Sequence, residues 1–150
     1  MTDVVQEIAC PPDQLEVDVV AAVLFDGRDM LNGPAGLLNR RLGYGLSFSI
    51  DRSVLVRSNH KVAARWVLFH GWAAGCPERD SDLRGLLAEL LRVCRRAGFE
   101  RIALAAPEAA LAKRNQWTPA LAEAASGAGV SECLITYDHS YLHDHTGPVF

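Results

Sequence analysis

The sequence predicts an α/β domain of three layers, in which a mixed, mostly parallel central sheet is flanked by helices. Two observations carry this prediction. Apolar segments rich in β-branched residues have the length of buried strands, and amphipathic helical segments alternate with them in the second half of the chain. The 150 residues suffice for one buried core and are few for two. We therefore expect a single domain over residues 1–137.

The first half of the chain consists of strand patterns separated by glycine and proline. Residues 15–25 alternate at first and then become continuously apolar, which is typical of a strand that passes from an edge into a covered sheet. The turn Gly33-Pro34-Ala35-Gly36 leads into a short helix that Gly43 closes. The expected strands are residues 4–9, 15–25, 46–50 and 53–56, and the expected helix is residues 37–42.

The second half contains the clearest helix, over residues 82–97. Its leucines recur at spacings of three and four residues, so they form one apolar stripe, with Ser81 as the expected N-cap and Gly98 just beyond the end. Thr118-Pro119 predicts the start of another helix, which runs to about residue 125. The remaining expected strands are residues 64–69, 101–106 and 130–137, followed by an irregular, histidine-rich tail over residues 138–150.

Composition and charge exclude several classes of protein. A net charge of -3 leaves no cationic excess for broad nucleic-acid binding, so a nucleic-acid partner is not expected. No window has the apolar length of a membrane helix, and the first eight residues lack the pattern of a signal peptide. The four cysteines are scattered singly. These features predict a cytoplasmic protein without a membrane partner.

The order of these elements resembles the amino-terminal, macro-like domain of the leucyl (cytosol) aminopeptidase family. In that family an apolar strand with a short acidic and glycine-containing end precedes a helix, a polar hairpin, a second strand and an amphipathic helix. The resemblance covers residues 18–106 of this chain. The corresponding segments are residues 19–27, 37–46, 52–58, 65–71 and 83–97.

This resemblance implies a domain without catalytic activity of its own. In the aminopeptidases the dinuclear metal site and the catalytic lysine and arginine belong to a separate carboxyl-terminal domain, and no Asn-Thr-Asp-Ala-Glu-Gly-Arg-like segment occurs here. No Gly-x-Ser-x-Gly elbow or Walker loop is present either. The expected role is oligomer assembly or the binding of a protein partner, and no cofactor is expected.

The macro-like resemblance implies an alternative, the binding of ADP-ribose or another nucleotide or small anion. The phosphate loops of macro domains are rich in glycine. In this chain Pro34 and Ala35 interrupt the first loop, which removes one backbone N–H donor and adds bulk, and the segment 107–117 has no glycine. If an anion binds, the backbone N–H groups before the first helix and the carboxyl end of the strand at 64–69 are where we expect it. The candidate ligand-binding residues are Asp26, Gly33, Gly36, His70 and Gly71.

Two further sets of residues suggest other roles. Large aromatic residues in segments that we expect to be exposed suit a protein interface. The tail concentrates potential metal ligands, and its histidines with neighbouring aspartates suggest a divalent metal site as a third interpretation. The candidate interface residues are Trp72, Trp117, Tyr141 and Phe150, and the candidate metal ligands are His139, His143 and His145.

Overall fold

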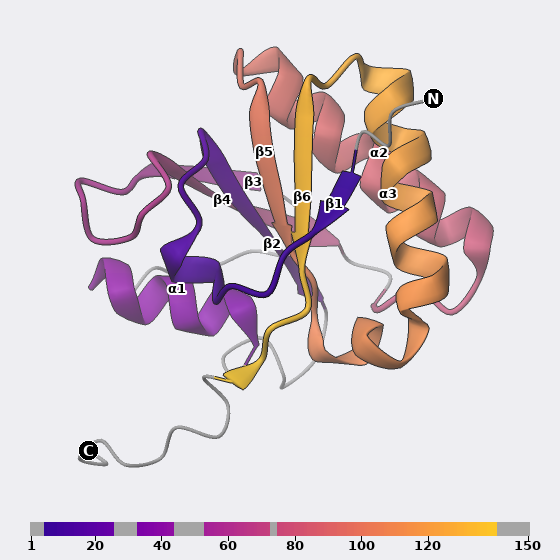
Figure 1. Ribbon diagram of the computed structural model, residues 1–150, viewed down its shortest axis with the longest axis horizontal. Helices are drawn as coiled ribbons and strands as arrows, with labels where there is room; N and C mark the ends of the chain where they lie inside the picture. Colours follow the sequence, from indigo (N-terminus) through magenta and orange to yellow (C-terminus); the bar gives the residue numbers. More distant parts are fainter. Residues whose placement is uncertain (1–4, 26–32, 44–52, 73–74, 141–150) are drawn as a thin grey trace.

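A computed structural model describes residues 5–25, 33–43, 53–72 and 75–140 of the chain (Figure 1). It contains six strands, three α-helices and two short 3₁₀ segments in these ranges. The strands are β1 (Val5–Glu7), β2 (Val19–Phe25), β3 (Ser53–Arg57), β4 (Trp66–Trp72), β5 (Arg101–Ala105) and β6 (Glu132–Thr136). The helical segments are η1 (Pro12–Gln14), α1 (Pro34–Leu42), α2 (Asp80–Arg96), η3 (Glu108–Lys113) and α3 (Arg114–Ala128).

The strands form one mixed sheet in the order β1-β6-β5-β2-β4-β3. Every neighbouring pair is parallel except β3 and β4, which are antiparallel, so β3 is the one reversed strand and lies at an edge. In the register Ala22 pairs with Ala105 on one side and with Phe69 on the other. The predicted class, a mostly parallel sheet flanked by helices, is confirmed.

Helices cover both faces of this sheet, with α1 on one side and α2 and α3 on the other (Figure 1). The two faces bury separate apolar clusters. The leucines of α2 pack with Trp117 of α3 against Val19, Ala21 and other residues of one face, and Leu38 and Leu42 of α1 pack against the opposite face. The side chains of β2 alternate between the two clusters because successive strand residues point to opposite faces. This alternation explains why the sequence of β2 is continuously apolar.

The observed strands overlap the expected ones but differ in their bounds, and for two of them the difference affects the packing or the site. Residues 15–18 precede β2 and do not belong to its ladder. Leu15 and Val17 are nevertheless buried, because they belong to the apolar cluster on the face that α1 covers; Val17 O accepts a hydrogen bond from Arg65 N. The strand expected at 64–69 runs as β4 to Trp72, so His70 and Gly71 lie inside the ladder. The strand expected at 46–50 lies outside the described residues.

All three helices begin earlier than the sequence pattern indicates. The helix α1 begins at Pro34, and α2 begins at Asp80 with Arg79 rather than Ser81 as its N-cap. The third helix was expected at Thr118 but begins at Arg114, so Pro119 lies inside it. Pro119 cannot donate the hydrogen bond of its position, but its neighbours Trp117 and Leu121 are buried in the core, and this packing holds the helix in place.

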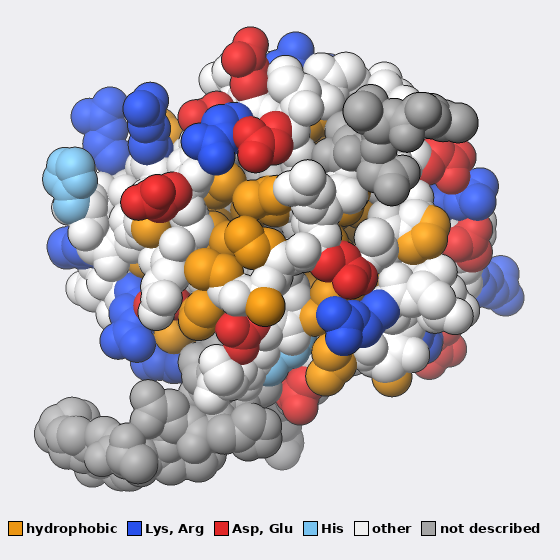
Figure 2. Space-filling model, viewed as in Figure 1, with side chains coloured by type: hydrophobic (Ala, Val, Ile, Leu, Met, Phe, Trp, Pro, Cys, Tyr) orange, Lys and Arg blue, Asp and Glu red, His pale blue; other side chains and the backbone are white. Residues whose placement is uncertain are grey.

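The surface carries charged groups of both signs. On the face seen in Figure 2, hydrophobic side chains gather near the middle, over the segment between β1 and η1, and acidic and basic residues surround them. Ile8 in this segment is 37% exposed. None of the helices in the described ranges combines the length and apolar character that a membrane span requires.

Candidate functional site

The carboxyl ends of the five parallel strands meet at one edge of the sheet. At this edge β2 and β5 are neighbours, and the chain leaves them in opposite directions. After β2 it continues to α1 on one face, whereas after β5 it continues through η3 to α3 on the other. A reversal of this kind marks the position at which α/β sheets usually bind ligands. We call this place the switch point.

The helix α1, which follows β2 in the chain, begins with few bonded backbone groups. Gly33 is the N-cap and makes no side-chain cap, and Pro34 occupies the first helical position. Leu37 N bonds to Gly33 O, while the helix geometry offers no intrahelical acceptor to the N–H groups of Ala35 and Gly36. Two of the expected residues, Gly33 and Gly36, therefore lie where the positive end of a helix dipole meets the sheet edge. Asp26 lies outside the described residues.

The β5 side of the switch point contains a buried histidine. After β5, Ala106 N donates to Thr136 O, and the ring Nε2 of His139 lies 2.8 Å from Ala106 O. The His139 residue is 9% exposed, so the domain continues into the segment that was expected to be a tail. The contact with a carbonyl oxygen occupies Nε2. His143 and His145 lie outside the described residues, and within those residues no group of three His, Cys, Asp or Glu could hold a metal; the metal site stays a prediction.

A cavity of about 370 Å³ lies further along the same edge, at the carboxyl ends of β1 and β6. Its Asp138 carboxylate accepts a hydrogen bond from Ser140 N at 2.9 Å, and hydrogen bonds from the Ser140 side chain and backbone lower the pKa of Asp138. The Arg114 guanidinium lies over the Tyr137 ring at 4.8 Å and 3.5 Å from Glu7. The cavity thus combines an ionised carboxylate with a flat cation. It is lined by Glu7, Ile8, Ala9, Arg114, Tyr137 and Asp138.

The structure separates the candidate interface residues. Trp117 is only 1% exposed and belongs to the core between α2, α3 and the sheet, so the expectation that it lies on the surface is wrong. The periodicity of α3 was missed because its helix was expected to start after Trp117. Trp72 is half-buried at the end of β4, and its indole Nε1 has no hydrogen-bond partner in the described structure. Tyr141 and Phe150 lie outside the described residues.

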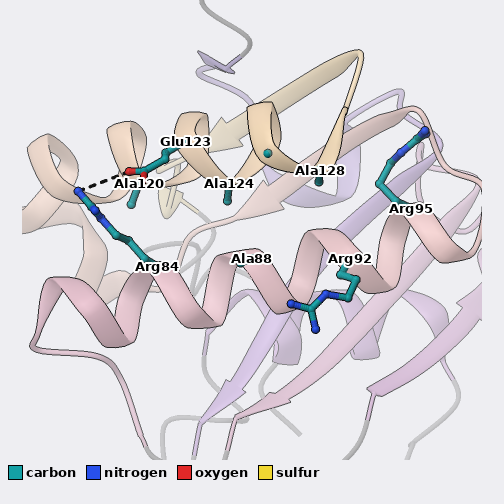
Figure 3. A pocket seen from close by; sticks show the side chains of 9 residues that line it. Arg84, Ala88, Arg92, Arg95, Ala120, Glu123, Ala124 and Ala128 are labelled. Carbon is teal, nitrogen blue, oxygen red and sulfur yellow. Dashed lines mark ion pairs between the residues drawn. The ribbon is translucent and has the colours of Figure 1, made fainter.

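A groove of about 450 Å³ lies between α2 and α3 on the outer surface. Arg84, Arg92 and Arg95 are spaced along α2, and Figure 3 shows Arg84 reaching towards Glu123 of α3. Arg84 is bound by two carboxylates, at 2.9 Å by Asp80 and at 3.4 Å by Glu123. Arg92 makes no ion pair with any described residue. The floor consists of small residues, Ala88, Ala120, Ala124, Gly127 and Ala128.

Comparison with known proteins gives a match by structure only. No family model matches the sequence, and no curated protein matches it. A Trypanosoma brucei macrodomain in complex with ADP-ribose superposes with a TM-score of 0.64 at 16% identity, over 91% of this chain and 65% of that one. The macrodomain of Mycobacterium tuberculosis DarG gives 0.62 at 13% identity, over 88% and 96%. The fold is macrodomain-like.

Another solved neighbour agrees with this assignment. The macrodomain of Thermus aquaticus DarG matches with a TM-score of 0.61 at 14% identity, over 88% of this chain and 97% of that one. The chain spans less than two thirds of the trypanosomal protein. The macro-like part of the sequence resemblance is confirmed at the level of the fold, and descent from an aminopeptidase amino-terminal domain stays a prediction.

Sequence reasoning missed several polar residues of this macrodomain-like fold. Asp138 belongs to the tail in which we expected metal ligands, and Arg114 was not among the candidate site residues. Neither position shows its role in the sequence, because the cavity forms only when β1, β6 and α3 come together. The arginines of α2 do carry a signal, since residues 84, 92 and 95 share one helical face, but the partner face on α3 depends on the fold.

Proposed function

We propose that this macrodomain-like protein binds a nucleoside diphosphate of the ADP-ribose type at the carboxyl edge of its sheet. We propose binding only, without catalysis on this ligand. The observation that carries the proposal is the reversal of the chain between β2 and β5, after which α1 begins on one face of the sheet and η3 and α3 follow on the other. Two of the structural neighbours were solved with ADP-ribose or ADP bound. Their low identity supports the fold alone, so the residues of this chain must carry the rest of the case.

Those residues form two candidate contact sites for the ligand, one with hydrogen-bond donors and one with an acceptor. The first turn of α1 offers backbone N–H groups, at Ala35 and Gly36, to a diphosphate. The cavity beside β1 and β6 offers the Asp138 carboxylate, which accepts hydrogen bonds from the amino group or hydroxyls of a nucleoside. The strand β6 is two positions from β2 in the sheet, a separation of about 10 Å. One extended dinucleotide-like ligand is long enough to occupy both.

The same residues predict weak binding. Pro34 supplies no N–H to a phosphate, and the segment after β5 forms the glycine-free η3 instead of an open loop. The diphosphate is therefore held from one side of the switch point rather than from two. We expect an affinity well below that of a site with two glycine-rich loops.

Isothermal titration with ADP-ribose, ADP and adenosine tests the proposal. We expect heat from ADP-ribose and ADP, less from adenosine, and a loss of several-fold in affinity for ADP-ribose in Asp138→Ala. Glu100→Ala is the matched control, because it removes an exposed carboxylate just before β5, at the opposite edge of the sheet. No heat with millimolar ADP-ribose, or equal affinities for the two variants, would contradict the proposal.

The groove between α2 and α3 favours a second function, the binding of a protein partner through an acidic segment. Arg84 already forms ion pairs with carboxylates of the same chain. Arg92 and Arg95 add two further positive charges beside the small residues that line the groove. Arg95 donates to Phe99 O, a neutral acceptor, so its charge is not offset by an ion pair with a described residue. This pattern complements a partner helix with glutamates along one face.

Fluorescence anisotropy with a labelled glutamate- and alanine-rich helical peptide tests this binding. We expect saturable binding that Arg92→Glu weakens several-fold and that added salt weakens too. Arg96→Glu makes the same charge change on α2 without lining the groove. Equal effects of the two substitutions, or preference for a lysine-rich peptide, would refute it. Light scattering on the same samples separates this outcome from self-association.

A further inference from the structure

Ser53 and His70 face each other across the antiparallel edge of the sheet. They are register partners in the β3–β4 ladder, so their side chains project from the same face as direct neighbours. Ser53 Oγ lies 2.6 Å from His70 Nδ1. Ser53 is exposed, whereas His70 is 2% exposed. The pair thus joins an accessible hydroxyl to a buried imidazole.

A carboxylate from α2 lies on the other side of this imidazole. Glu89 Oε2 is 3.9 Å from His70 Nε2, which is beyond hydrogen-bonding distance but close enough for electrostatic attraction. The negative charge favours the tautomer with the proton on Nε2, which leaves the lone pair of Nδ1 to accept the Ser53 hydroxyl. Desolvation by burial lowers the pKa of His70, and Glu89 only partly offsets it. The imidazole is therefore neutral, and a competent base, at neutral pH.

A purely structural histidine does not explain this geometry. The Nε2 atom of His70 is buried and makes no hydrogen bond with any described residue. A buried donor left in this state costs about 1–3 kcal/mol. Costs of this kind concentrate where a group is held ready for chemistry, as at the nucleophile, base and orienting acid of acyl-transfer enzymes.

We propose that Ser53 is a nucleophile for small acyl esters, with His70 as its base and Glu89 as a positioning residue. Ser53 Oγ attacks the ester carbonyl carbon while its proton passes to His70 Nδ1. The bond between that carbon and the leaving oxygen then breaks, and His70 returns the proton to the departing alkoxide. Water, activated by the same nitrogen, hydrolyses the acyl-serine and regenerates Ser53.

The surroundings of Ser53 limit the substrate. Ser53 opens an edge strand, so one side of it is accessible to a ligand from solvent. Leu55 lies two residues further on the same face and is 40% exposed, which gives a short acyl chain an apolar contact. This inference is independent of the nucleotide proposal, and it departs from the non-catalytic role that the sequence resemblance implies.

Covalent labelling with an alkyl fluorophosphonate tests the inference directly. The Ser53 oxygen forms a bond to phosphorus, fluoride leaves, and the proton goes to His70, so no further reactant is needed. We expect one adduct per chain, located at Ser53 by peptide mass spectrometry, and its absence in Ser53→Ala. Hydrolysis of p-nitrophenyl acetate follows the same variants. Ser126→Ala is the matched control, because it removes another exposed serine far from the histidine.

The roles of His70 and Glu89 are tested by measuring the rate at which their variants are labelled. We expect His70→Gln to slow labelling by roughly 100-fold, the scale of general-base catalysis. Glu89→Gln, on a half-exposed side chain, should slow it less and shift the pH profile towards acid, because the charge that favours protonation of His70 is gone. If His70→Gln does not fold, Glu89→Gln alone tests whether this pair activates Ser53.

Three results would overturn the inference: no adduct on the wild-type protein, an adduct on another serine, or equal labelling rates in wild type and Glu89→Gln. ADP-ribose titration of Ser53→Ala separates the two proposals. Unchanged binding with lost labelling is the expected outcome.

Discussion

The carboxylate of Asp18 accepts a hydrogen bond from the backbone N–H of Arg101 at 3.0 Å, although the two residues are 83 positions apart. The same carboxylate oxygen accepts from Glu100 N at 3.1 Å, and Asp18 N donates in return to Arg101 O. Asp18 O also accepts from Trp66 N. One residue thus fixes the entry of β2 against both of its neighbours, β5 and β4, which form the central part of the sheet that contains the switch point.

We expect Asp18→Asn to lower the free energy of unfolding by about 1–2 kcal/mol at neutral pH, since hydrogen bonds to a charged acceptor are the stronger kind. The bond from Arg101 N is the largest factor that lowers the pKa of Asp18 in the fold. The carboxylate therefore stabilises the protein above its unfolded pKa of about 3.9, and the stabilisation disappears as the pH falls through the lower folded pKa. Urea unfolding from pH 7 to about pH 2 measures this dependence.

In acid, Asp18→Asn should lower the free energy of unfolding by less, because protonated Asp18 carries no charge either. Glu16→Gln is the control, because Glu16 is exposed and its side chain makes no hydrogen bond or ion pair with a described residue. A constant difference between wild type and Asp18→Asn across the whole pH range would contradict the linkage.

One glycine inside α2 and one just beyond its end have opposite expected responses to alanine. Gly98 follows the helix with φ +88°, and Phe99 N bonds to Cys94 O across it, so the chain reverses there through the left-handed region. Gly98→Ala should cost about 1 kcal/mol, because a Cβ is strained at positive φ. Gly85 lies inside the helix with no atom within 4 Å of an added Cβ, so Gly85→Ala should stabilise by about 0.5–1 kcal/mol.

Thermal or urea unfolding of the two variants and the double variant measures both effects. The sites are at opposite ends of α2, so the changes should add. Destabilisation by Gly85→Ala would contradict the open space around this position.

Periodicity in the sequence predicted most of the fold. The leucine stripe of α2 and the continuous apolar run of β2 each depend on burial by one neighbouring layer, so local pattern suffices to detect them. Element boundaries were harder. Ser81 and Thr118 have the chemistry of N-caps, but α2 and α3 start earlier, because the docking of their first turns outweighs the capping preference.

The candidate sites were less visible in the sequence. The turn Gly33-Pro34-Ala35-Gly36 is visible in the sequence, and the structure places Gly33 and Gly36 at the start of α1. Ser53 and His70 are 17 residues apart and meet only through the antiparallel register of β3 and β4. No sequence motif encodes that pairing, so a search for nucleophile motifs passes over it.

Trp117 should be a core residue rather than an interface anchor. It is 1% exposed and packs with the leucines of α2. Trp117→Ala should lower the free energy of unfolding by about 3–5 kcal/mol, because it removes apolar contact and leaves a cavity. Leu111→Ala, at a residue 43% exposed, should change it by less than about 0.5 kcal/mol. Equal, small effects of both substitutions, measured by urea unfolding, would place Trp117 at the surface after all.

The four cysteines should divide into two reactive and two protected thiols. Desolvation by burial raises the pKa of both Cys94 and Cys133 to about 12, so neither forms appreciable thiolate in the native state. Cys10 and Cys76 are only half-buried, and burial raises their pKa as well, so we expect them to react more slowly than a free thiol.

Disulfide exchange with an aromatic disulfide reagent at mildly alkaline pH should modify two thiols in the folded protein and four in denaturant. Peptide mapping identifies them, with Cys10→Ser and Cys76→Ser as controls that each remove one fast-reacting thiol. Modification of Cys94 or Cys133 at the rate of Cys76 would mean that the helix α2 and the strand β6 separate in the native state, because these two thiols are buried where those elements pack together.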